Sequence, residues 1–127
     1  MSENSSEHHF ALAVTVAVEA LKALLLVNGG AATALIALSD KSMGYSKYGT
    51  AVLLFALAAL LNAVTLVVGY FSQLAYANHR FSREQNDVGG ANANFKWHRI
   101  SQIAAICFVL MSLLASALGM SFAFLAV

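Results

Sequence analysis

Glu19 and Lys22 are the residues of this sequence with the clearest capacity for chemistry. They lie three residues apart, so on a helix they share one face and can form an ion pair. Pairing lowers the cost of bringing either charge into a medium of low dielectric constant. Beside water such a pair is ordinary, whereas inside an apolar medium it is a candidate functional site. The elements around the pair decide between these two interpretations.

Four histidines raise the question of a metal site or a pH-dependent switch. They are His8, His9, His79 and His98. Adjacent histidines on a helix point in different directions, and no HxxxH or HxxE spacing occurs in the sequence. The sequence also contains no phosphate-binding loop. We therefore expect neither a metal site nor another cofactor.

Serines in the last apolar stretch offer a second candidate chemistry, nucleophilic hydrolysis. Ser112 and Ser116 would need a base, and His98 precedes them on the same predicted helix. At 1.5 Å rise per residue, Ser112 lies about 21 Å from His98, too far for proton transfer. We therefore expect no enzyme and interpret both serines as packing residues.

The composition indicates a membrane protein. The chain has 127 residues, of which 60% are hydrophobic and 10% charged, and its mean hydropathy is +0.73. Soluble domains carry about 25% charged residues, so this chain has too little polar surface to cover a core in water. The composition excludes disorder and nucleic-acid binding, and the net charge is only +1. The length allows one domain, 1–127.

Three stretches without charge predict the fold. Each approaches or exceeds the roughly 20 residues that a helix needs to cross a bilayer. These stretches cover residues 23–39, 48–78 and 100–127. Turn-rich connections join them, so neighbouring helices should be antiparallel. We predict an all-α integral membrane protein, an antiparallel bundle of three long transmembrane helices over about 6–39, 46–86 and 93–126.

Basic residues are distributed unevenly between the two ends of this bundle. The end with the N-terminus and the second connection holds Lys22 and a basic cluster formed by Arg80, Arg83, Lys96 and Arg99, against Lys41 and Lys47 at the other end. The positive-inside rule predicts an N-in, C-out topology, and the basic cluster also suits anionic lipid headgroups. Glu19 and Lys22 are then expected at the inner interface, because burying ions costs several kcal/mol.

Small and polar residues form one stripe on each predicted helix. Lipid gives no hydrophobic drive for helix association, so we expect the three stripes to converge and pack. Asn62 is expected to hydrogen-bond within the bundle rather than to bind a substrate. The stripes contain His8, Thr15, Glu19, Lys22, Gly29, Gly30 and Thr33; Ala51, Ala58, Asn62, Thr65, Gly69, Gln73 and Tyr76; and Ser101, Ala105, Ser112, Ser116, Gly119 and Ala123.

Asn28 does not fit this arrangement. It lies on the opposite side of its helix from Glu19, so in a lone bundle its amide would face lipid. A second copy of the chain would cover it, through a symmetric contact that includes Leu24, Ala31 and Leu35. The alternative is that Asn28 bonds its own helix backbone or a neighbouring Ser or Thr.

The segment Glu19-Ala-Leu-Lys-Ala-Leu-Leu-Leu-Val-Asn28-Gly-Gly-Ala-Ala-Thr-Ala-Leu resembles the first span of small bacterial membrane proteins with a Leu-rich segment ending in Asn-Gly-Gly-Ala. The resemblance implies a multi-pass protein of a bacterial inner membrane and brings no activity with it. An acid early in the first span also resembles small multidrug transporters, which implies a transporter that uses Glu19.

These observations together give an expectation about function. We expect a homo-oligomer with channel-like or membrane-perturbing activity, whose partners are membrane lipids and itself. One alternative is a non-catalytic accessory subunit that packs on a larger membrane protein. Another is a small-molecule or ion transporter. The candidate functional residues are Glu19, Lys22, Asn28 and Asn62.

Overall fold

Three long helices make up the fold. The computed structural model describes residues 3–41 and 48–126, with side chains over 11–39 and 48–126. The helices are α1 (Glu3–Lys41), α2 (Gly49–Glu84) and α3 (Val88–Leu125). Each is long and apolar enough to cross a membrane, and the described residues contain no strand. The predicted all-α fold, three long apolar helices that pack on one another, is confirmed.

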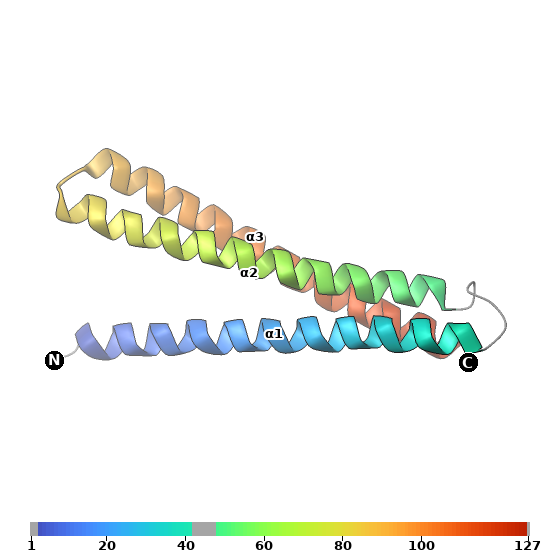
Figure 1. Ribbon diagram of the computed structural model, residues 1–127. Helices are drawn as coiled ribbons and strands as arrows, with labels where there is room; N and C mark the ends of the chain where they lie inside the picture. Colours follow the sequence, from blue (N-terminus) through green and yellow to red (C-terminus); the bar gives the residue numbers. More distant parts are fainter. Residues whose placement is uncertain (1–2, 42–47, 127) are drawn as a thin grey trace.

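The two ends of the molecule differ in what they hold. The N-terminus lies at the same end as the α2–α3 turn, and the C-terminus lies at the other end (Figure 1). Consecutive helices are antiparallel, and α3 crosses α2 along much of its length. The basic cluster therefore lies at the end that holds the N-terminus.

The turn between α2 and α3 is tighter than the sequence suggested. We expected the third helix to begin near residue 93, but α3 begins at Val88. The Asp87 side chain caps it by accepting a hydrogen bond from the Gly90 N–H at 3.0 Å. Asn86 adopts a φ of 59°, the left-handed conformation that a sharp chain reversal needs. The two adjacent glycines therefore lie in the first turn of α3 rather than outside it.

The interface between α2 and α3 is built from small residues, as predicted. Ala51, Ala58, Ala115 and Gly119 are buried in it. A Cβ added at Gly119 would lie 3.2 Å from the Phe55 ring, so the two helices could not approach as closely with a larger residue there. The expected inward stripes of the second and third helices are confirmed.

The expected inward face of the first helix is wrong. Among the side chains of α1 that the structure describes, residues 11–39, the buried ones are Asn28, Ala32 and Ser39. The stripe that we expected to face inward lies outside instead; we call its exposed members, Thr15, Glu19, Lys22, Gly30 and Thr33, the outer stripe.

Local hydrogen bonding explains why the expected inward face of α1 lies outside. Thr15 and Thr33 donate to the carbonyls of Ala11 and Gly29 on their own helix, at 3.0 and 2.9 Å. These hydroxyls therefore tolerate an apolar surface, whereas the Asn28 amide needs a partner from another helix.

The packing of α1 is lopsided. Only 6% of the residues in its most apolar window are buried, against 28% for α2 and 17% for α3. It lies against α2 near the α1–α2 connection and separates from the other two helices toward its N-terminus (Figure 1). The result is a closely packed α2–α3 pair, with α1 packed against one side of it over part of its length.

Candidate functional site

A polar core lies at the centre of the bundle, formed by Asn28, Asn62, Ser112 and Ser116. Asn28 and Asn62 are 2% and 0% exposed. Asn28 lies within hydrogen-bond distance of Ser116 on α3, and Asn62 lies on α2 one turn from Ala58, whose carbonyl accepts from Ser112. Both asparagines are therefore buried inside the bundle, although the sequence pattern had placed Asn28 outside it.

Hydrogen bonds tie the polar core across the helices. The Ser112 hydroxyl donates to the Ala58 carbonyl at 3.0 Å, which joins α3 to α2. The Ser116 hydroxyl lies 2.9 Å from Asn28 Oδ1 and 2.8 Å from the Ser112 carbonyl, so its one proton is shared between two acceptors. This contact joins α3 to α1. The prediction that Asn28 faces lipid is wrong, and its open alternative, a bond to a neighbouring Ser, is what the structure has.

Three buried polar atoms of the polar core make no hydrogen bond within the described chain. They are Asn28 Nδ2 and the two amide atoms of Asn62. Each such atom costs about 1–3 kcal/mol relative to a paired one. The predicted hydrogen bonding of Asn62 inside the bundle is therefore wrong, although its predicted burial is correct.

A histidine cluster joins α2 to α3 near their turn. It consists of Ser72, Tyr76 and His79 on α2 with Phe95 and His98 on α3. His98 is buried, and its ring centroid lies 5.1 Å from that of Tyr76. The His79 ring lies 5.2 Å from Phe95. The sequence analysis missed this cluster, because its members are brought together only by the antiparallel register of the two helices.

The histidine cluster contains a Ser–His pair, and its geometry identifies a clamp. His98 Nδ1 lies 2.9 Å from the Ser72 carbonyl and 2.9 Å from the Ser72 hydroxyl. A carbonyl only accepts, so Nδ1 carries the proton and cannot take one from the hydroxyl. His79 Nδ1 likewise donates to the Ala91 carbonyl at 2.7 Å. Each histidine thus donates its Nδ1–H to a group on the other helix. A ring nitrogen used in this way joins α2 to α3 and cannot activate a nucleophile.

Glu19 and Lys22 form the expected ion pair. Lys22 Nζ donates to Glu19 Oε1 at 2.8 Å, and both side chains are exposed on the outer stripe. Glu19 therefore lies on the side of α1 opposite the buried Asn28.

The basic cluster surrounds the α2–α3 turn. Arg80, Arg83, Lys96 and Arg99 are all exposed. Among the residues with described side chains, no three His, Cys, Asp or Glu gather as metal ligands; His8 and His9 lie outside that set. Cys107 is a free, exposed thiol on α3.

Comparison of the chain with protein-family models, curated proteins and solved structures finds no match.

Proposed function

We propose that this chain is a non-catalytic, multi-pass protein of a bacterial inner membrane that assembles into a homo-oligomer through the outer stripe of α1, with a channel-like or membrane-perturbing effect. The observation that carries the proposal is the orientation of Glu19 and Lys22. Their ion pair lies on the face of α1 that the rest of the bundle leaves uncovered.

The depth of the pair sets its cost. Lys22 lies about 28 Å along α1 from Lys41, less than the roughly 30 Å thickness of the hydrocarbon. Val18 and Leu21, beside the pair on α1, line one cleft with Leu66 and Gly69, which belong to the charge-free stretch 48–78 of α2. The pair is therefore proposed to lie in the inner leaflet of the hydrocarbon, where a covering protein surface that pairs the charges is favoured over lipid.

A second copy of the chain supplies such a surface. Copies around an axis normal to the membrane lie at equal depth, and Glu19 and Lys22 differ in height by only about 4.5 Å. Glu19 of one copy can therefore pair with Lys22 of the next, so that the intramolecular ion pair is exchanged without leaving a charge unpaired. The glycine at position 30 permits close approach on the same face.

The same axis offers a polar path. The polar core is buried inside each copy, so it cannot line a pore between copies. The outer stripe instead places Thr15, Glu19, Lys22 and Thr33 around the axis, where hydroxyls and charges can hydrate an ion. The N-in, C-out topology is proposed from the basic cluster at the end that holds the N-terminus.

Charge reversal tests the oligomer. In a Cys107→Ser background, a cysteine at Leu26, beside the outer stripe, should form disulfide-linked dimers in membranes, whereas a cysteine at the exposed Leu60 of α2 should not. Glu19→Lys should abolish the crosslink by leaving like charges together, and the double variant Glu19→Lys/Lys22→Glu should restore it. Ion flux in liposomes should follow the same order.

Two outcomes would overturn the proposal. A monomeric protein in nanodiscs, without crosslinking at Leu26, would exclude the oligomer. A crosslink from Leu26 to a different co-purifying membrane protein, without flux, would establish an accessory subunit instead.

A further inference from the structure

An apolar cleft opens between α1 and the α2–α3 pair, in the half of the bundle nearer the N-terminus. It has a volume of about 570 Å³, and its walls include Val18 and Leu21 of α1, Leu66 and Gly69 of α2, and Ile106 of α3. Ligand sites typically occupy about 300–1,000 Å³. The cleft exists because α1 separates from the other two helices there (Figure 1).

Gly69 leaves open space at the wall of the cleft. A Cβ added to this residue would meet no heavy atom within 4 Å, although the residue faces α1. Gly119, in the tight interface, would place the same atom 3.2 Å from Phe55. The wall of the cleft at Gly69 is therefore unoccupied by the protein's own side chains.

The size of the cleft favours a flexible hydrocarbon chain over a helix. A helix of about 10 Å diameter occupies roughly 1,200 Å³ over three turns, about twice the volume of the cleft. An acyl chain is much thinner. In a membrane, acyl chains are also the solvent of every exposed apolar surface, so one is always at hand.

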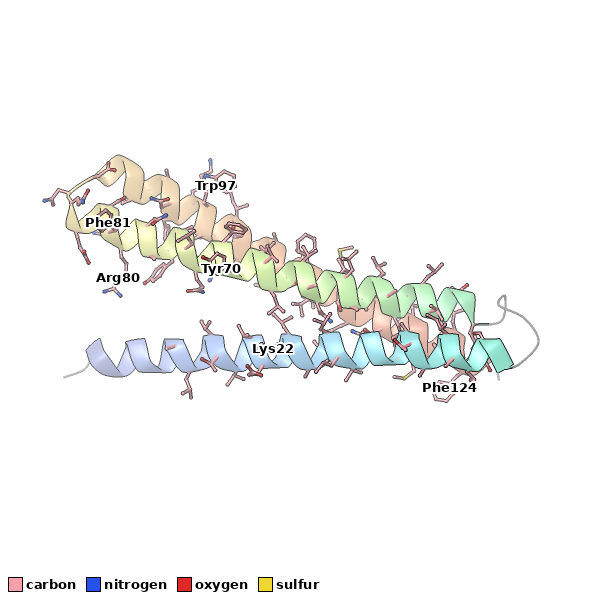
Figure 2. The ribbon with its side chains drawn as sticks, in the orientation of Figure 1. Lys22, Tyr70, Arg80, Phe81, Trp97 and Phe124 are labelled. Atoms are coloured by element: carbon pink, nitrogen blue, oxygen red, sulfur yellow. The ribbon has the colours of Figure 1, made fainter. Side chains whose placement is uncertain are left out.

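Polar groups follow the cleft in a definite order along α2. Gln73 lies at its border, and Arg80 follows seven residues later, two helical turns and about 10 Å farther along the same face. The Arg80 side chain extends from α2 toward α1, over the space that separates the two helices (Figure 2). Its guanidinium presents five donors in a geometry that matches phosphate, and these can serve more than one acceptor.

We propose that this cleft binds an anionic phospholipid, with one acyl chain between α1 and α2 and the phosphate at Arg80. The sequence of surfaces along α2 matches the sequence of chemical groups in such a lipid. Hydrocarbon meets the apolar walls, the glycerol esters meet the Gln73 amide, and the phosphate meets the guanidinium. The lipid fills the space that the lopsided packing of α1 leaves open.

Native mass spectrometry of the purified full-length chain tests this site. With dioleoyl phosphatidylglycerol and dioleoyl phosphatidylcholine supplied in equal amounts, one lipid per copy should bind, with a several-fold preference for phosphatidylglycerol. Gly69→Leu should fill the cleft and reduce binding about tenfold. Gly30→Leu is the matched control, because Gly30 also has no heavy atom near an added Cβ but lies on the outer stripe.

The headgroup contact has its own variants. Arg80→Gln should remove the preference for phosphatidylglycerol while one lipid still binds, and Arg80→Lys should restore part of the preference. Arg83→Gln, which removes a charge beside the α2–α3 turn, should leave the preference unchanged.

Equal lipid binding by the wild type and Gly69→Leu would overturn the proposal. So would a Gly69→Leu variant that binds lipid normally but changes oligomeric state, because the cleft would then hold a second copy. The lipid site and the oligomer are separable, since Gly30→Leu should disrupt the oligomer alone.

Discussion

Between α2 and α3, polar side chains bridge the helices at three heights, whereas α1 leans on this pair with little of its surface covered. His79, His98 and Ser112 each hydrogen-bond to α2 or α3 backbone across the α2–α3 interface. On α1, the described side chain that reaches α3 is Asn28, through the hydroxyl of Ser116. The α2–α3 interface combines close packing with several hydrogen bonds between the helices. The contact of α1 with this pair involves only one face of α1.

We call the α2–α3 pair the scaffold and α1 the arm. A region with few buried contacts opens at a lower free energy than a densely packed one. The α2–α3 pair should therefore persist when α1 moves, and the outer stripe and the lipid-sized cleft both lie on or beside the element that is free to adjust. The features proposed to act on lipid or on other copies thus belong to the weakly attached part of the fold.

The largest expected effect comes from separating the tight pair. Gly119→Leu would drive a side chain into Phe55 and Leu54, whose nearest atoms lie 3.2 and 3.3 Å from an added Cβ. Overpacking of this kind costs about 1–3 kcal/mol. Thermal unfolding in detergent, followed by circular dichroism, should show a clear loss of stability. Gly30→Leu should show almost none, and similar losses for the two variants would erase the distinction between the two interfaces.

Removing a clamp should have the next largest effect. His98→Ala leaves the buried Ser72 groups without their partner and removes the contact with the Tyr76 ring, for a loss of about 1–2 kcal/mol. His98→Asn should recover part of that loss, because its amide N–H can replace Nδ1–H. Trp97→Ala, at an exposed neighbouring position, is the control. A His98→Ala variant as stable as Trp97→Ala would show that the clamp contributes nothing.

Asn62 should respond in the opposite direction. Leucine has the same branching as asparagine and carries no polar atoms, so Asn62→Leu removes two buried atoms that make no hydrogen bond. We expect stability to rise by about 1 kcal/mol. A loss of stability in unfolding measurements would mean that the Asn62 amide has a partner that this account lacks.

Asn28→Leu should change stability less than Asn62→Leu does. It breaks the bond from Ser116, which keeps its second acceptor, the Ser112 carbonyl, at a cost of about 0.6 kcal/mol. It also removes Nδ2, a buried atom that makes no hydrogen bond, so the two effects should largely cancel. Oligomer formation should be unchanged, since Asn28 is buried within one copy. Dissociation of the oligomer by this variant would contradict the placement of the interface on the outer stripe.

The smallest effect on folding is expected from the exposed ion pair. Glu19→Gln and Lys22→Gln should leave the unfolding of one copy unchanged, because exposed pairs contribute little to stability. Their effect should appear only in crosslinking at Leu26. A large destabilisation would place the pair inside the fold.

The sequence predicted some of these features and not others, for physical reasons. Hydropathy and charge placed three helices, and helical periodicity placed Ala58, Asn62, Ser112 and Gly119 at the interface between the second and third. The same periodicity failed for the first helix, because it counts polarity and not whether a polar group can satisfy itself. Thr15 and Thr33 bond their own backbone, and Glu19 pairs with Lys22, so none of them needs to be inside.

The histidine cluster was missed for a different reason. Ser72 and His98 are 26 residues apart, and His79 and Ala91 are 12 apart. Both pairs follow from one register, which the turn at Asn86 and Asp87 fixes. A register set by a turn conformation leaves no periodic signal. Testing each Ser and His on the second predicted helix against the antiparallel third would have found Ser72 with His98, whereas Ala91, the partner of His79, lay outside the predicted third helix.

The most direct test of the contrast between scaffold and arm is a pair of distance distributions from double electron–electron resonance. Spin labels at Ala20 and Ala77, in a Cys107→Ser background, report α1 against α2, and labels at Ala77 and Ala93 report α2 against α3; all three positions are exposed. In nanodiscs we expect a narrow distribution for the second pair and a broad one for the first, which narrows when anionic lipid is added. Equally narrow distributions for the two pairs, insensitive to lipid, would contradict the account.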